Sequence, residues 1–204
     1  MDYNIKKAFM VPSFLFLVLF AISLMAHSQD TTRQVTPGEV SNTDSLLVYN
    51  FDIAQNIEPS AWRLTKRAFA EARNFEADYI VVNVNTYGGL VNIADSIRTE
   101  FLNSEIPVIV FIKNNAASAG ALISIAADSI YMREGARIGA AAVVNQQGEI
   151  MPEKYQSYMR STMRATAEAH GKDTLVRGRD TIIQWHRNPI MAEAMVDPSI
   201  VVEG

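Results

Sequence analysis

One serine of the chain stands where its hydroxyl could act as a nucleophile. Ser118 lies in a run of small residues, Ala116 to Gly120, between an apolar stretch and a segment of helical character. At the start of a helix the first backbone N–H groups are unpaired and the positive end of the helix dipole is close, so an oxyanion forming there is stabilised. The pattern therefore permits acyl transfer, and Ser118 taken alone also fits an ordinary helix N-cap.

A glycine pair follows a second apolar stretch. Gly88 and Gly89 come shortly after a run that ends at Val84. Two residues without Cβ let the backbone approach a ligand closely and direct an N–H group into a site. A plain turn can have the same sequence, so the pair supports a site only together with other groups.

A serine nucleophile needs a base. His27 precedes the predicted domain, and neither His170 nor His186 lies beside a predicted turn at a sheet end. A Ser-His-Asp arrangement therefore stays open, without support from the spacing.

Two lysines are candidates for the base. Lys154 stands 36 positions after Ser118 in the first turn of a predicted helix, and Lys113 ranks second. A lysine accepts a proton only when its amine is neutral, so burial against Met151 and Tyr155 is expected to lower its pKa from about 10.4 towards 7 or 8. The alternative is a solvated lysine on a helix surface.

The composition excludes several other kinds of site. The chain has no cysteine, which rules out disulfides, thiolate metal sites and a cysteine nucleophile. The net charge of −4, with basic residues scattered among acidic ones, does not favour nucleic-acid binding. No metal or cofactor is expected. With 49% hydrophobic residues, the part that follows the first 28 residues is long enough for one folded domain.

Strand-like and helix-like segments alternate along this domain. Continuous apolar strands separated by helices predict an α/β fold with a parallel sheet covered on both faces, and ligands bind beyond the carboxyl ends of such strands. Loops at 85–89 and 113–118 are expected at those ends. Residues 172–189 are predicted to be a loop. Strand character is found at 46–53, 79–84, 108–112, 130–132 and 138–144, and helical character at 59–74, 90–102, from 118 onward, at 152–169 and at 190–195.

The first residues have the features of an export signal. Lys6 and Lys7 precede an apolar run from Phe14 to Met25, and small residues flank a cleavage position before Gln29. An uncleaved membrane anchor is the alternative. In both cases the rest of the chain is expected on the extracytoplasmic side of the membrane, or in the periplasm. The predicted organisation is a signal at 1–28, a flexible leader at 29–45 and a domain at 46–204.

Several ordered motifs together resemble the protease domain of NfeD-type membrane-bound serine proteases, in the ClpP and crotonase-like superfamily. The resemblance extends from about Leu46 to Gly204. The motifs are Tyr87–Leu90, Ile106–Val108, Ala116–Ile123, Ala126–Asp128, Ile138–Ala140 and Met191–Pro198.

This resemblance implies a fold, an activity and roles for particular residues. The fold would be a ClpP/crotonase-like superhelix of β-α-β units with a mostly parallel sheet. Ser118 would be the nucleophile and Lys154 the general base, with Gly88, Gly89 and Ala119 at the oxyanion hole. The implied substrates are hydrophobic segments of membrane-associated proteins such as stomatin-like partners, and the implied assembly is a homodimer or a higher oligomer.

Three departures from the family pattern leave other functions open. The turn that usually reads Asp-Thr-Pro-Gly-Gly is Asn85-Thr86-Tyr87-Gly88-Gly89, residues 174–188 resemble an insertion on the substrate side, and the chain stops where long relatives continue into membrane spans. An inactive module of the same fold that binds membrane-protein segments is one alternative. A crotonase-like acyl-CoA enzyme is another, although export from the cytoplasm argues against it.

Overall fold

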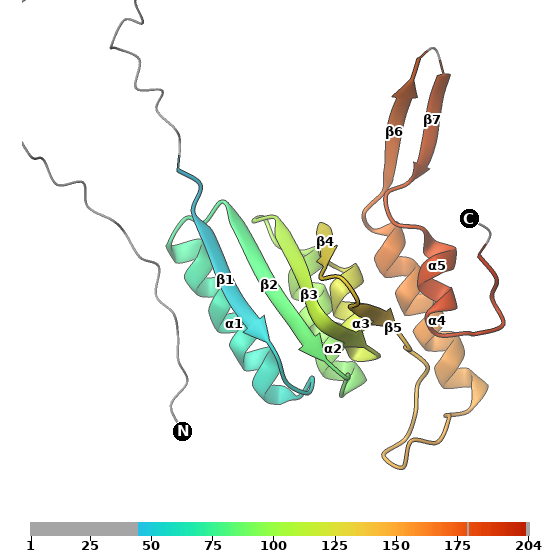
Figure 1. The fold of residues 1–204 in the computed structure, drawn as a ribbon. Coiled ribbons are helices and arrows are strands. Elements are labelled where there is room, and N and C mark those ends of the chain that lie inside the picture. The colour runs from blue at the N-terminus through green and yellow to red at the C-terminus, as the bar shows by residue number, and fades with distance from the viewer. Residues whose placement is uncertain (1–44, 179, 203–204) are drawn as a thin grey trace, which may run out of the picture. The chain divides into compact units, whose positions relative to one another are not determined.

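The computed structural model describes residues 45–178 and 180–202, so the predicted signal and nearly all of the predicted leader lie outside the described residues. A parallel sheet forms the centre of the fold, with strand order β1-β2-β3-β4 and a short β5 that pairs with the end of β3 (Figure 1). Its strands are β1 (Val48–Ile53), β2 (Tyr79–Thr86), β3 (Val108–Ala117), β4 (Ser129–Met132) and β5 (Arg137–Gly139).

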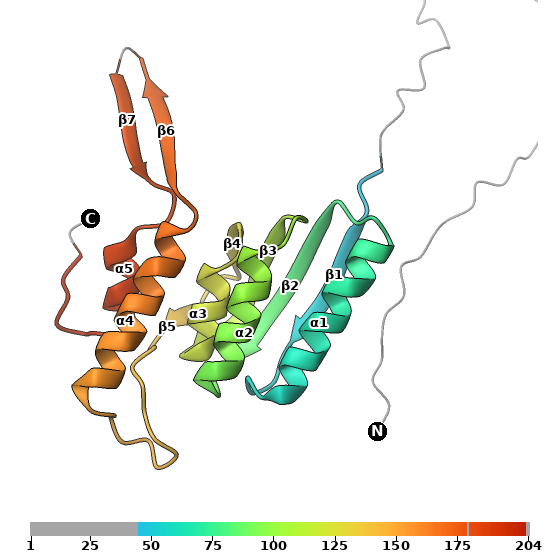
Figure 2. The same cartoon turned by 180° about the vertical axis from the view of Figure 1, so that it is seen from behind.

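Three helices connect these strands and all lie on one face of the sheet (Figure 2). The predicted covering of both faces is therefore wrong for the described residues. The reason is topological: the strand order runs in one direction, and right-handed crossovers that never reverse direction place every helix on the same side. The helices are α1 (Pro59–Asn74), α2 (Val91–Leu102) and α3 (Ala119–Ile125).

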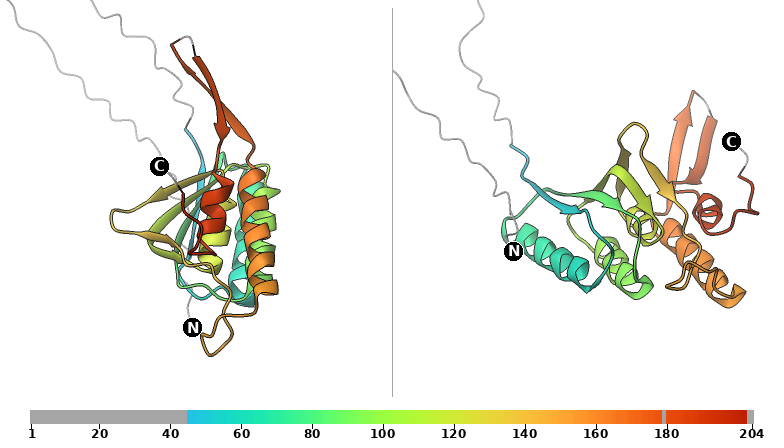
Figure 3. Two further views of the ribbon diagram at one scale, coloured as in Figure 1. Left: turned by 90° about the vertical axis from the view of Figure 1, so that its right-hand side faces the viewer. Right: turned by 60° about the horizontal axis from the view of Figure 1, so that its bottom comes forward.

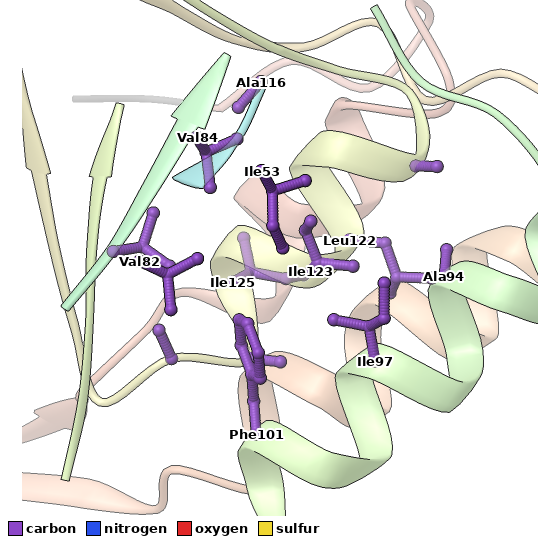
Figure 4. Close-up of a cluster of buried hydrophobic side chains, with 14 of the residues drawn as sticks. Ile53, Val82, Val84, Ala94, Ile97, Phe101, Ala116, Leu122, Ile123 and Ile125 are labelled. Atoms are coloured by element: carbon purple, nitrogen blue, oxygen red, sulfur yellow. The ribbon is translucent and has the colours of Figure 1, made fainter. Parts of the chain in front are cut away.

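The core fills the space between the sheet and these helices. Every second residue of β2, beginning at Ile80, is buried against the helices, as expected for a strand with one covered face. Phe69 of α1 stacks on Phe101 of α2 with ring centroids 5.4 Å apart. Figure 4 shows side chains of α2 and α3 meeting those of β2, including Ile97 and Leu122. This packing holds α3, which follows Ser118, against the sheet.

Strand β3 continues beyond its predicted end. The expected loop at 113–118 is wrong because residues 113–117 stay in the strand. The final part pairs with β5, Ala117 opposite Gly139, while Ala116 lies opposite Thr86 of β2. These long-range pairings keep polar residues such as Lys113 in extended structure despite their low strand propensity.

The C-terminal part contains a helix, a hairpin and a second helix. Helix α4 (Glu153–Glu168) ends at its C-cap residue Ala169, where the predicted helix also ends, and Gly171, whose φ is +70°, lies two residues beyond that cap. The predicted loop at 172–189 is wrong: β6 (Lys172–Arg177) and β7 (Asp180–Trp185) form an antiparallel hairpin, and α5 (Pro189–Ala194) follows. The hairpin projects away from the sheet (Figures 1 and 3). In the described part of the chain, none of the helices combines the length and apolar character needed to cross a membrane.

Candidate active site

Ser118 occupies the turn between β3 and α3 in a strained backbone conformation. Its φ is +54° and its ψ is −119°, a combination that residues with a Cβ rarely adopt. The Ser118 N–H donates to the carbonyl of Gly139 at 2.8 Å, and its own carbonyl accepts from Ala121 at 2.9 Å. The turn is thus held from both sides. Among the described residues no hydrogen bond engages the Ser118 hydroxyl.

The glycine turn packs directly against this serine. A Cβ built on Gly88 would lie 2.7 Å from the Ser118 Cβ and 3.1 Å from its Oγ, so only glycine fits there. A Cβ on Gly89 would lie 2.4 Å from the carbonyl oxygen of Ile57. The structure therefore brings together the two sequence features, the serine and the glycine pair, that the sequence predicts separately.

The backbone amides around Ser118 are unevenly available. The Gly88 N–H donates to the buried hydroxyl of Thr86 at 3.1 Å, so it is already paired. The Gly89 N–H has no acceptor among the described residues. On either side of it, the Gly88 carbonyl accepts from the Ile57 N–H, and the Leu90 N–H donates to the Ile57 carbonyl. Ala119 is the first residue of α3, and its amide has no partner within that helix. The amides of Gly89 and Ala119 therefore have no acceptor among the described residues, whereas the Gly88 amide is bonded to Thr86.

Three further residues shape the turn and were not identified from the sequence. Thr86 bonds the Gly88 amide, and its methyl group would lie 2.6 Å from a Cβ on Gly120, so this helix position also requires glycine. The carbonyl oxygen of Gly139 accepts a hydrogen bond from the Ser118 N–H. The contact of Gly120 in α3 with Thr86 in β2 and the bond from Ser118 to Gly139 join segments far apart in the sequence, so neither follows from local pattern.

Ser118 lines one small cavity, and a larger cavity adjoins it. The smaller, of about 60 Å³, is lined by Ser118, Gly89 and Ala119. The larger, of about 900 Å³, is lined by Lys154, Tyr155 and Tyr158. Four apolar residues line both cavities and join them: Val91, Val143, Val144 and Met159.

Lys154 lines the larger cavity, but it is not buried. It is exposed, and its amine lies 5.4 Å from the centroid of the Tyr155 ring. The expected burial against Met151 and Tyr155 is therefore absent, because one face of α4 and the wide cavity leave the amine open to solvent. Among the described residues no hydrogen bond joins Lys154 to Ser118.

The other candidate bases lie elsewhere. Lys113 is paired with Asp52 of β1 at 3.0 Å and lines neither cavity. His170 and His186 lie together, with ring centroids 5.9 Å apart, near the opposite end of α3 from Ser118. Of the lysines and histidines within the described ranges, only Lys154 lines either of these two cavities.

The C-terminal end of α3 is supported by a cation. The partly buried guanidinium of Arg187 donates to the carbonyls of Ile125 and Ala127, and Nε2 of His170 lies 2.9 Å from the Ile125 oxygen. Positive groups stabilise the negative end of a helix dipole. Because Ser118 precedes this seven-residue helix, these contacts help to fix its position.

The contact of His170 with the end of α3 makes the stability of the fold depend on pH. Burial, and next the charge of Arg187, lower the pKa of His170 from its ordinary value of 6.5. The unfolded chain therefore binds a proton that the folded chain resists, and stability falls as the pH drops below about 6.5. We expect His170→Gln to lose less of its Tm between pH 7.5 and 5.5 than the wild type. Calorimetry at pH 8, where His170 is neutral in both states, measures the packing effect separately, and equal acid sensitivity of both proteins would contradict the assignment.

Comparisons of the sequence identify a family and two relatives. The family profile described as "NfeD1b, N-terminal domain" matches residues 47–204. The membrane protein NfeD1b of Bacillus subtilis is 35% identical over 153 residues, which are 75% of this chain and 32% of that protein. The membrane-bound protease PH1510 of Pyrococcus horikoshii is 27% identical over 138 residues, 64% of this chain and 31% of that protein. The chain thus spans about a third of the length of these relatives.

Comparisons of the structure identify the same kind of fold. One similar structure is a lysine-to-alanine mutant of the 1510-N membrane-bound stomatin-specific protease in complex with a substrate peptide. It superposes with a TM-score of 0.64 at 25% sequence identity, over 75% of this chain and 67% of that one. ClpP1 from Listeria monocytogenes gives a TM-score of 0.51 at 22% identity, over 60% of this chain and 72% of that one. The ClpP-like α/β fold with a mostly parallel sheet is therefore confirmed.

Proposed function

The chain belongs to the family of NfeD1b N-terminal domains, and from that membership we propose that it is a serine endopeptidase with Ser118 as nucleophile and Lys154 as general base. The observation that carries the proposal is the strained turn at Ser118, with φ +54°, packed against a glycine that admits no side chain. Strain of this kind persists only where the surrounding structure holds it, and it is concentrated at functional sites.

The proposed chemistry uses a serine and a neutral amine. The Ser118 hydroxyl attacks the peptide carbonyl while Lys154 takes its proton and then gives it to the leaving amine. The amides of Gly89 and Ala119 donate to the oxyanion, and losing one such donor typically costs about 10²–10³ in rate. In the unliganded chain Lys154 is exposed, so a bound substrate must cover it and bring its amine to the hydroxyl.

The surroundings of the site favour an apolar peptide as substrate. The four side chains common to the two cavities are Val91, Val143, Val144 and Met159, and a peptide lying along them would displace water from both. Such a peptide would supply the cover that Lys154 lacks. Hydrophobic segments of membrane-associated proteins have this character, and the similar 1510-N protease is described as stomatin-specific. We extend that substrate class, with a stomatin-like partner, to this chain.

The descriptions of the relatives support a place of action at a membrane. Both curated relatives are described as membrane proteins or membrane-bound. We propose that this domain, residues 46–204, works at the extracytoplasmic face of a membrane. The segment before it would deliver or anchor it there.

Covalent labelling tests the nucleophile directly. The purified full chain, treated with an alkyl fluorophosphonate, should be modified at Ser118, identified by mass spectrometry of its peptides. Ser118→Ala should abolish the modification, while Ser157→Ala, which removes an exposed hydroxyl of α4, should leave it unchanged. Modification at no serine, or equally at Ser157, would contradict the proposal.

A binding module without catalysis is the second candidate, favoured by the exposure of Lys154. Such a module would bind an apolar peptide in the larger cavity without cleaving it. Peptide binding measured by calorimetry, together with intact peptide after prolonged incubation, would favour this candidate over the protease.

A further inference from the structure

The loop that connects β5 to α4 forms a wall of both the smaller and the larger cavity (Figure 1). Five of its residues line the larger cavity, and two of these, Val143 and Val144, line the smaller one as well. Ser118 lines the smaller cavity and Lys154 the larger. A peptide bound beside the serine would therefore contact a surface whose position depends on this loop.

Hydrogen bonds within the loop give it a defined shape. At its base the Met151 N–H donates to the Val143 carbonyl at 2.9 Å. At its tip the side-chain oxygen of Asn145 accepts from the N–H groups of Gln147 at 3.0 Å and Glu149 at 2.9 Å. All of these bonds join loop residues to one another, so they do not attach the loop to helix α4.

A buried side-chain amide makes that attachment. Oε1 of Gln156 accepts from the Val143 N–H at 2.9 Å, and its Nε2 donates to the carbonyls of Val143 at 2.7 Å and Met151 at 3.0 Å. The Gln156 side chain is buried, and the two donated bonds match the two N–H groups of its amide. Gln156 lies two positions after Lys154 in α4, so one helix carries the proposed base and holds the loop.

The partners of this side chain require an amide. A glutamate in its place would direct a carboxylate oxygen at two carbonyl oxygens, and a methionine of similar length would leave the Val143 N–H and the Met151 carbonyl without these bonds. A polar group that loses its partner away from water costs free energy, and the loop avoids this cost by moving towards solvent. Replacement of Gln156 is therefore expected to release the loop from α4.

We propose that Gln156 is a positioning residue: its amide fixes the loop 143–151 against α4 and thereby sets in advance the wall along which an apolar peptide binds. This inference rests on the proposed function, because the wall affects cleavage only if a peptide binds beside Ser118. Binding to a preset surface avoids the entropic cost of ordering it. Loss of the amide therefore raises KM and leaves the chemical step at Ser118 largely unchanged.

Matched glutamine variants of the purified full chain test this role. Gln156→Met should raise KM for a fluorogenic apolar peptide about tenfold, with kcat within about threefold of the wild type. Gln156→Glu should raise KM at least as much, because its carboxylate repels both carbonyls. Gln184→Met makes the same chemical change at an exposed position of β7 that lines neither cavity, and it should keep the wild-type KM.

Peptide binding without turnover separates this inference from the proposed function. In a Ser118→Ala background, fluorescence anisotropy of the same peptide carrying fluorescein should show about tenfold weaker binding when Gln156→Met is added. This comparison does not require Ser118 to be the nucleophile. A lack of fluorophosphonate labelling at Ser118 would therefore refute the protease, whereas only the binding comparison decides the role of Gln156.

Three results would overturn the positioning role. They are equal peptide affinity with and without Gln156→Met, a fall in kcat at unchanged KM, and equal effects of Gln156→Met and Gln184→Met. A lower Tm with unchanged affinity would assign Gln156 to the stability of the fold alone. Should Gln156→Met unfold, Gln156→Asn, whose amide is one methylene too short to keep all three bonds, takes its place in the same comparisons.

Discussion

Replacing Ser118 by alanine should lower kcat/KM for cleavage of an apolar peptide by about 10⁴-fold or more. Removing the nucleophile of a serine hydrolase leaves only the rate enhancement from substrate binding and the oxyanion donors. Alanine keeps the Cβ that contacts Gly88, so the turn and the fold should persist. The measurement is steady-state cleavage of a fluorogenic peptide whose sequence follows a hydrophobic stomatin-like segment.

Matched lysine variants test the other half of the proposed dyad. Lys154→Ala should cost about as much as Ser118→Ala, and the double variant should cost little more than either, because residues that act as a unit are not additive. Lys66→Ala, which removes an amine stacked on Trp62 of α1, should retain full activity. Equal turnover by wild type, Ser118→Ala and Lys154→Ala would refute the dyad, whereas loss with Ser118→Ala alone would point to another base.

Gly89→Ala should be among the most destabilising single substitutions in the chain, by about 3 kcal/mol or more. The new Cβ would meet the N, C and O atoms of Ile57 at 2.4–2.8 Å, and backbone cannot rotate away as a side chain can. Moving the two segments apart to relieve this clash would break the two backbone hydrogen bonds of 2.8 Å that join Ile57 to Gly88 and Leu90. Urea denaturation followed by circular dichroism measures the free energy of unfolding.

A second glycine provides the control for backbone strain alone. Gly135 also has a positive φ, +78°, but a Cβ added there would meet nothing within 4 Å. Gly135→Ala should therefore cost only about 1–2 kcal/mol, the conformational term. If the two variants were equally stable, the close contact between Gly89 and Ile57 would not be the cause of the glycine requirement.

Much of the architecture follows from local sequence. The sequence predicts a helix over 59–74, the bounds that α1 has, because Pro59 suits a first helical turn and apolar residues recur at helical spacing. The strand predicted at Tyr79–Val84 and the glycine just beyond α4, Gly171, are equally local signals, although β2 continues to Thr86 and is buried on one face only. Ser118 and the glycine pair are visible as candidates in the sequence, where each taken alone also fits an ordinary N-cap or turn.

The tertiary structure decided what local pattern does not encode. Strand order placed all three crossover helices on one face, and pairing with β5 extended β3 through Lys113. Thr86 became part of the site because Gly120 of α3 packs against it, and Lys154 stayed exposed because the cavity beside it is wide. The spacing of apolar residues in the sequence predicts contacts between residues that are a few positions apart. Strand pairing, close backbone contacts and burial depend on segments far apart in the sequence, so only the folded chain determines them.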